Sequence, residues 1–350
     1  MRMDLIPGLP NDLGLEGLIR IDYQDFSSVA SVCRSWNRLI ELPEFWRRRK
    51  ASGLTRKVVV MAQCRVDPVW VQEWQFYELK LYEPETGYRA LLPPPVPGGL
   101  PISSQLVGVG LNLVVMGGLN PNTSEVMTDD VFVYNFVAAT WHRGAKMPGH
   151  NRWYFACASD SNRMVFVAGG HDDKNRELKS AMAYDVAEDK WMVLPDMARE
   201  RDESKGVFHH GKFLVIGGYS KNQHRFGITA ESFDIATWQW DPVQEGFLNS
   251  ETCYRHCTDD GDGKLFKYRG DYVEALQGST WQLVAKLPTR VKDISYMIAW
   301  QGKVLVIGSV DGEGELYKSF VLDLKSSKWE SVEKEYEFLG HVESGCCLEL

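Results

Sequence analysis

The residues best suited to chemistry in this chain are a few short groups of cysteine, histidine and aspartate. Cys253 and Cys257 flank His256, and these are side chains that zinc binds, but no fourth ligand follows at a zinc-site spacing. The aspartate-rich segment 259–263 is similar to the start of a calcium loop, yet it lacks the glutamate at the twelfth position. We therefore expect structural thiols at the first group, a turn at the second, and no metal site.

Two adjacent pairs also lack the partners that catalysis needs. His209-His210 precedes a glycine and has no nucleophile motif near it. Cys346-Cys347 is too short a pair for an unstrained disulfide and lies in an alternating apolar stretch, which favours core thiols. The seven cysteines are irregularly spaced, which indicates a reducing compartment, and no paired Cys-x-x-Cys set exists for a built-in zinc RING. The sequence thus predicts no catalytic residue and no cofactor.

The sequence repeats a structural pattern instead. Four times an apolar run ends on a glycine, and a lone tryptophan follows 21 to 24 residues later. The runs occupy 113–118, 165–170, 213–218 and 304–309, and the tryptophans are Trp141, Trp191, Trp240 and Trp329. A period of about 48 residues indicates a repeat architecture, and apolar runs of this length are typical of buried strands.

Each repeat is predicted to form four short strands. In one copy they are 153–159, 164–169, 181–185 and 191–194. The same order returns at 205–209, 212–217, 231–234 and 240–243, and again at 294–300, 303–308, 320–323 and 329–332. Four strands per unit in a meander are typical of a β-propeller blade.

Two further units depart from the pattern and bring the predicted number of blades to six. One has 265–268 as its second strand and Trp281 at the tryptophan position, without a glycine pair. The other begins at 57–63, has Tyr88 where the tryptophan should be, and lacks an innermost strand. The tail at 341–348 resembles that missing strand, so we expect it to close the ring and to remove the open edges of a linear array. A disordered tail is the alternative.

The first 50 residues show helical periodicity. The apolar residues of 26–33 recur on one helical face as far as Cys33, with Asp25 placed as the cap. Pro10 and Pro43 mark the starts of two further helices. We predict a helical domain at 1–50, a short linker at 51–56 and a strand-rich domain at 57–350.

The two domains differ in charge. The formal net charge is −8, and residues 1–56 carry 9 basic against 7 acidic side chains, which leaves 30 against 40 for the rest. An acidic repeat domain is a poor surface for nucleic acid. No apolar run has the length of a bilayer span, and no signal peptide is visible at the start. We expect a location in the cytoplasm or nucleus, with no nucleic-acid or membrane partner.

Both domains resemble known families. The repeats resemble kelch repeats, in which a strand ends on a glycine doublet and an aromatic–acidic pair such as Tyr184-Asp185 precedes the tryptophan. The first domain resembles an F-box through Leu9-Pro10-Asn11-Asp12-Leu13, Val32-Cys33-Arg34-Ser35-Trp36 and Pro43-Glu44-Phe45-Trp46. The combination is similar to the plant F-box/kelch-repeat proteins. It implies a mainly β fold, a six-bladed kelch β-propeller preceded by a small helical F-box domain.

The resemblance implies a role without bond chemistry. Proteins of this kind dock on a Skp-type adaptor of a cullin–RING ubiquitin ligase, and the propeller holds a protein substrate for ubiquitination and degradation. Similar plant proteins are associated with turnover of phenylalanine ammonia-lyase in phenylpropanoid metabolism, or of response regulators in cytokinin signalling. The expected adaptor-binding residues are Leu9, Pro10, Leu13, Ile19, Val32, Cys33 and Trp36.

Three alternatives to this hypothesis stay open. The helices form an ordinary small core of their own, or they brace a scaffolding kelch protein that has no ligase role. The third alternative is a propeller enzyme with a metal or radical site on its axis. Because no histidine recurs at matching positions of the blades, the sequence disfavours the enzyme.

Strand order predicts which end of the propeller binds the substrate. In a four-stranded meander the loop after the second strand and the segment before the first lie at the same end. We expect a ring of basic side chains around that mouth, formed by Arg152, Arg201, Arg290, Arg176, Arg225 and Lys221. The arginine fork suits carboxylates and peptide carbonyls. Local pairing with acidic neighbours such as Asp172 and Asp202 is the alternative.

Overall fold

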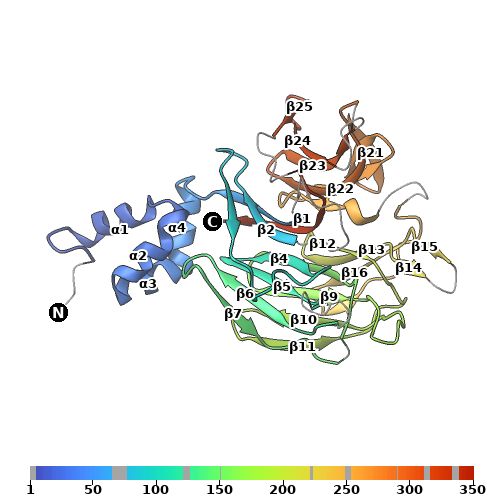
Figure 1. Cartoon of the computed structure of the whole chain (residues 1–350), viewed down its shortest axis with the longest axis horizontal. Coiled ribbons are helices and arrows are strands. Elements are labelled where there is room, and N and C mark those ends of the chain that lie inside the picture. The colour runs from blue at the N-terminus through green and yellow to red at the C-terminus, as the bar shows by residue number, and fades with distance from the viewer. Residues whose placement is uncertain are drawn as a thin grey trace.

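Helices begin the chain and strands make up almost all of the rest (Figure 1). The computed structural model describes residues 5–64, 77–120, 127–149, 151–220, 224–248, 254–289, 291–310, 316–332 and 339–350. The N-terminal helices are α1 (Asn11–Ile19), η1 (Tyr23–Asp25), α2 (Phe26–Val32), α3 (Arg34–Glu41) and α4 (Pro43–Ala51). None of the described helices is long and apolar enough to cross a membrane.

The described strands form six antiparallel four-stranded sheets, which are the blades of a β-propeller. From the axis outward, blade 1 contains β26 (Val342–Glu349), β1 (Lys57–Cys64), β2 (Tyr77–Tyr82) and β3 (Arg89–Leu92). Blade 2 contains β4 (Gln105–Val109), β5 (Asn112–Met116), β6 (Val131–Asn135) and β7 (Thr140–Gly144). Blade 3 contains β8 (Ala156–Ser159), β9 (Met164–Ala168), β10 (Ala181–Asp185) and β11 (Lys190–Leu194).

The remaining blades follow the same order. Blade 4 contains β12 (Lys205–His209), β13 (Lys212–Ile216), β16 (Ala230–Asp234) and β17 (Gln239–Trp240). Blade 5 contains β18 (Thr258–Asp259), β19 (Leu265–Arg269), β20 (Tyr272–Gln277) and β21 (Thr280–Lys286), with η2 (Tyr254–His256) before it. Blade 6 contains β22 (Val291–Trp300), β23 (Lys303–Val310), β24 (Tyr317–Asp323) and β25 (Lys328–Ser331). A separate hairpin, β14 (Tyr219–Ser220) with β15 (Arg225–Phe226), extends from blade 4. The six predicted blades are confirmed.

The C-terminal strand closes the ring, as predicted. β26 pairs with β1 from Lys57 opposite Glu349 to Gln63 opposite Val342. Gly345 lies where this strand passes blade 6, and a Cβ there would stand 2.7 Å from the Tyr296 hydroxyl and 2.8 Å from a backbone oxygen of β1. The closing strand therefore needs a glycine at this close approach.

Each marker tryptophan joins its blade to the one before it. The indole nitrogens of Trp141, Trp191, Trp240, Trp281 and Trp329 donate to the backbone oxygens of Pro93, Ala145, Pro195, Phe247 and Lys286, at 2.7–2.8 Å. The prediction that Tyr88 takes this position in blade 1 is wrong by one residue. Each marker tryptophan except Trp281 stands opposite the residue seven positions before it, and in blade 1 it is Arg89 that stands opposite Tyr82. Arg89 also donates to the carbonyl oxygen of Val332 in blade 6.

The first strand of blade 3 is shorter than predicted. It was expected to begin at Trp153, but β8 begins at Ala156. Trp153 pairs with His171 through two backbone hydrogen bonds of 3.0 Å, and Tyr154 then adopts a left-handed φ of 51°. That bridge joins the segment before the first strand to the loop after the second. The two therefore lie at the same end, as strand order predicted.

The helical domain differs from its prediction in one helix. Helix α2 ends at Val32 because Cys33 is extended, with a φ of −161°, and the Asp25 side chain makes no capping bond. Asp22 caps η1 instead by accepting from the Gln24 N–H at 3.0 Å. Gly14 in α1 is buried, and a Cβ there would lie 3.4 Å from Leu5, so a small residue suits this contact.

The helical domain is fixed to the end of blade 1 by backbone and side-chain bonds. Arg56 and Leu350 exchange backbone hydrogen bonds of 2.6 and 2.8 Å, which extend the β1–β26 ladder into the linker. The Glu349 carboxylate accepts from Thr55 and from the ammonium groups of Lys50 and Lys57, each at 2.9 Å. The linker between α4 and β1 is therefore part of the folded structure.

Core residues continue this connection between the helices and the sheet. Buried residues of the helices and of blades 1 and 2 form one continuous hydrophobic cluster. Arg49, which is 2% exposed, donates to the carbonyl oxygens of Ile19, Ile21 and Leu54. A buried guanidinium with three carbonyl partners holds α4 against the turn after α1 and against the linker.

We predict that the junction weakens in acid through Glu349. Burial alone would raise its pKa, but Lys57 and Lys50 outweigh this and lower the pKa to about 2 from the ordinary 4.5. A depressed folded-state pKa stabilises the fold above the unfolded pKa, and this contribution is lost as the pH falls from about 4.5 to about 2. Glu349→Gln should therefore be less stable than wild type at pH 7, and the difference should shrink across this window in urea unfolding measured at several pH values. A difference that is constant with pH would contradict this role.

Candidate interaction surfaces

One candidate surface lies on the helical domain, where large apolar side chains face solvent. Leu9 is 39% exposed, Leu13 58% and Val32 61%, and Pro10 and Cys33 are exposed beside them in sequence. We call these five residues the helical apolar surface. Contiguous exposed apolar side chains mark interaction sites, and these residues are exposed apolar candidates on the helices.

Two of the predicted adaptor-binding residues, Ile19 and Trp36, are not exposed on this surface. Ile19 is only 3% exposed and packs in the core of the chain itself, so its prediction as a surface anchor is wrong. It lies at the end of α1, beside Leu18, which is also buried. Trp36 is half-buried, and its indole N–H donates to the Leu5 carbonyl oxygen at 2.8 Å. Trp36 thus helps to fix the segment before α1.

The prediction of a basic ring around the mouth is wrong for Arg152 and Arg201. Arg152 and Arg201 are each 3% exposed. Arg152 donates to the carbonyl oxygens of Gly169 and Ser180 and to the Ser180 hydroxyl. Burial lowers the pKa of Arg152 to about 10. These guanidinium groups link strands inside a blade, so they do not reach a substrate.

Arg201 repeats this arrangement in blade 4 and adds an ion pair. It donates to the carbonyl oxygens of Gly217 and Thr229, to the Thr229 hydroxyl at 2.8 Å, and to the buried Glu231 carboxylate at 3.0 Å. The glycine doublet ends the second strand, and its carbonyl needs a donor there. The arginine supplies it, from 17 residues before the first glycine in blade 3 and 16 residues before it in blade 4.

The structure describes two of the other four members of the predicted ring. Arg176 pairs with Asp172 at 2.6 Å, which is the local pairing that was the alternative. Arg225 is exposed on the β14–β15 hairpin. Arg290 and Lys221 lie outside the described residues.

A different set of side chains surrounds the axis at this end of the propeller. Glu343 accepts from the Ser103 N–H at 3.0 Å and from the Ser103 hydroxyl at 2.5 Å, and Ser103 also bonds Tyr154. Glu203 pairs with Arg255, and the Arg255 charge acts in turn on Glu343. Glu343, Ser103, Tyr154, Glu203 and Arg255 come from blades 1, 2, 3, 4 and 5 respectively, and we call them the rim.

Backbone conformation positions part of the rim. Ser103, Tyr154 and Glu203 each precede their inner strand by two residues, and each has a left-handed φ between 51° and 58°. Such a φ is uncommon for residues with a Cβ and is found at functional sites. Sequence reasoning missed the rim because serine, tyrosine and glutamate at one repeat position share no recognisable motif.

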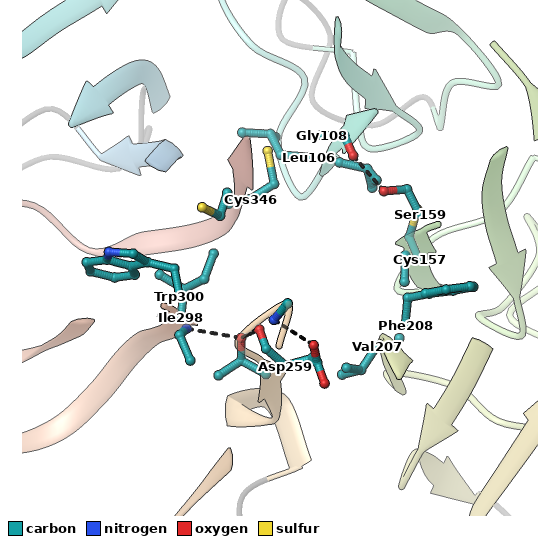
Figure 2. A pocket seen from close by; sticks show the side chains of 18 of the residues that line it. Leu106, Gly108, Cys157, Ser159, Val207, Phe208, Asp259, Ile298, Trp300 and Cys346 are labelled. Atoms are coloured by element: carbon teal, nitrogen blue, oxygen red, sulfur yellow. Dashed lines mark hydrogen bonds between the residues drawn. The ribbon is translucent and has the colours of Figure 1, made fainter. Parts of the chain in front are cut away.

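Inside the rim, a channel of about 200 Å³ follows the axis. The inner strands of all six blades line it, and Figure 2 shows Leu106, Cys157, Val207, Ile298 and Cys346 around its open centre. At the end far from the rim, His209 bonds the Asp259 carboxylate at 2.6 Å. The Asp260 carboxylate accepts the N–H groups of Asp262 and Lys264, so segment 259–263 is a turn, as predicted.

The cysteine and histidine residues that the sequence offered as metal ligands are accounted for by the protein's own packing where the structure describes them. Cys257 is buried, and burial lowers the pKa of His256 to about 3, which keeps its ring neutral. Cys253 lies outside the described residues. Within the described ranges, no group of three histidine, cysteine or acidic side chains could hold a metal ion.

Comparison with known proteins finds family matches in both the helical domain and the propeller. A family model described as F-box-like matches residues 6–51, and one described as Kelch motif matches residues 152–198. The F-box/kelch-repeat protein At1g80440 of Arabidopsis thaliana is 44% identical, with 99% of this chain and all of the relative covered. This chain belongs to the F-box/kelch-repeat family. The F-box/kelch-repeat protein At1g15670 of the same plant is 45% identical over the same shares of both chains, and At2g44130 is 34% identical over 72% of this chain and 68% of the relative.

For this F-box/kelch-repeat protein we predict that Arg201 contributes to stability. Arg201→Ala should lower the free energy of unfolding by about 3–5 kcal/mol, because it leaves the buried Glu231 carboxylate without its cation and with backbone N–H donors only. Arg199→Ala is the matched control, since the Arg199 side chain is 47% exposed and its ion pair with Glu245 should contribute at most about 1 kcal/mol. Denaturant unfolding of both variants checks this. Equal effects would show that Arg201 does not hold the blade together.

Proposed function

We propose that this protein is the substrate-recognition subunit of a Skp–cullin–F-box ubiquitin ligase, acting in the cytoplasm or nucleus. The observation that carries the proposal is the placement of the two candidate surfaces. The helical domain joins the propeller where β26 ends, at Glu349, whereas the rim residue Glu343 lies at the start of the same strand. Six residues of strand span about 20 Å. Figure 1 accordingly has the helices at one end and the β14–β15 hairpin at the other.

The mechanism that this arrangement supports is positional. The helical apolar surface would bury against a Skp-type adaptor and leave the rim facing away from it. The bonded linker allows little rotation between the domains, so a bound protein would be held at a fixed distance from the ligase core. Raising the effective concentration of a substrate lysine near the ubiquitin-loaded enzyme is an entropic contribution, and it needs no catalytic group in this chain.

The rim is the surface that we propose for the protein substrate. It presents two carboxylates, a tyrosine and an arginine around the channel mouth, and His341 stands between Tyr77 and Tyr317 beside it. Tyrosine and arginine are enriched where interfaces concentrate their binding energy. Phenylalanine ammonia-lyase and cytokinin response regulators, associated with similar plant proteins, are the first substrates to test.

The adaptor half of the proposal is tested by charge substitution on exposed leucines. Leu13→Asp and Val32→Asp should each abolish co-purification of a Skp-type adaptor without unfolding the protein, because both side chains are more than half exposed. Leu283→Asp is the matched control, since Leu283 is 61% exposed on an outer propeller strand and should leave adaptor capture unchanged. Adaptor captured equally by all four proteins, or by none, would overturn the ligase role and favour a scaffolding role.

The substrate half is tested by reversing a charge on the rim. Arg255→Glu places a third carboxylate beside Glu203 and Glu343, so we expect loss of the captured substrate in cells treated with a proteasome inhibitor, while the adaptor stays bound. Arg163→Glu is the control at the opposite end, and its side chain is 50% exposed against 57% for Arg255. Mass spectrometry of the captured proteins compares the two. Loss of substrate from the Arg163 variant alone would contradict binding at the rim and would indicate a binding site at the opposite end.

A further inference from the structure

The inner wall of the channel carries a lysine without a counterion. Lys205 is the first residue of β12 and lines the channel. Its side chain is half-buried, and its ammonium group forms no hydrogen bond or ion pair with any described residue. A partly buried cation is costly unless an acceptor or an anion satisfies it.

The groups around Lys205 do not supply that anion. The titratable groups that interact with its charge are the thiols of Cys157 and Cys257 and the neutral ring of His256. Burial raises the pKa of the Cys157 thiol well above its ordinary value, so the thiol is neutral. Glu203, two residues earlier, pairs with Arg255 at the rim. The positive charge of Lys205 is therefore uncompensated within the described part of the chain.

The other charged groups of the channel wall have partners, and among them the Asp260 carboxylate accepts two backbone N–H groups. Lys57 bonds Glu349 at 2.9 Å. Asp259 bonds His209, which lies four residues along β12 from Lys205, and four residues of strand correspond to about 13 Å. Lys205 is thus the one unpaired cation among the described lining residues, and it is separated from the carboxylates at the far end.

We propose that the channel binds a small organic carboxylate, with its anionic group on Lys205. A single unpaired ammonium matches a monoanion, whereas a phosphate dianion would call for a second cation or a cluster of backbone N–H donors. The remaining wall suits the rest of such a molecule. Leu106, Val207 and Ile298 offer apolar contact, and Gln105 and Ser344 offer hydrogen bonds. Apolar walls with a few polar groups are typical of small-molecule sites.

The channel is large enough for this class of ligand. It offers about 200 Å³ to a ligand, which restricts the class to small carboxylates. The site opens beside the rim, because Lys205 is only two residues from Glu203. The proposal does not depend on the ligase role, since it rests on the channel and its lysine alone.

The test is calorimetric titration of the full-length protein with benzoate as the carboxylate probe and benzamide as its neutral counterpart of similar shape. We expect benzoate to bind at least tenfold more tightly than benzamide to wild type. Lys205→Met should abolish this preference, and Lys205→Arg, which keeps the charge, should retain it. Lys190→Met is the matched control, because Lys190 is exposed on an outer strand of blade 3 and its loss should leave benzoate affinity unchanged.

Thermal unfolding without ligand gives a second measurement. Because Lys205 has no counterion in the described structure, Lys205→Met should be at least as stable as wild type. The proposal is overturned if wild type shows no preference for benzoate, or if Lys205→Met keeps it. It is also overturned if Lys205→Met unfolds at a markedly lower temperature, since the ammonium would then have a structural partner.

Discussion

The hydrogen bond from each marker tryptophan to the blade before it is the contact on which the propeller depends. A propeller has no single core, so neighbouring blades must be held in register one pair at a time. The indole N–H reaches a carbonyl on or beside the preceding outer strand, at nearly the same distance in blades 2 to 6. Three of these bonds are exposed to solvent and two are part-buried, so each contributes about 1 kcal/mol net. The repeated bond therefore fixes spacing as much as it adds stability.

Blade 1 lacks this tryptophan bond, and other contacts take its place. It has no tryptophan at the equivalent position, and Arg89 donates to blade 6 instead. The same blade receives the C-terminal strand, whose pairing with β1 runs along the whole inner edge. The seam of the ring is thus held by a backbone ladder and by a charged donor, and the helical domain is attached at this reinforced seam. Attachment at this point restricts the motion of the helical domain relative to the propeller.

Blade geometry also decides which side chains reach the surface. In blades 3 and 4 the loop after the second strand begins with a glycine doublet, and the carbonyl of its first glycine accepts from a buried arginine. With these cations committed to the interior, three of the five rim residues, Ser103, Tyr154 and Glu203, lie two positions before the inner strands and are turned by their left-handed backbone. Their contacts run from blade to blade around the axis, so the rim is positioned by a rigid scaffold. The same convergence brings Lys205 to a channel wall whose described residues offer it no partner.

The sequence by itself determined the features that depend on local pattern. The strand–glycine–tryptophan period gave the blades, the alternation of residues 341–348 indicated the closing strand, and the Leu9-Pro10 and Trp36 motifs indicated the helical domain. These signals survive because strand and helix periodicity are encoded within a few neighbouring residues. Tertiary structure alone decided what each polar or apolar side chain does. The burial of Arg152, Arg201 and Ile19, the role of Arg89 and the assembly of the rim depend on contacts between residues distant in sequence, and an arginine that binds a substrate looks the same in a sequence as one that binds a buried carbonyl.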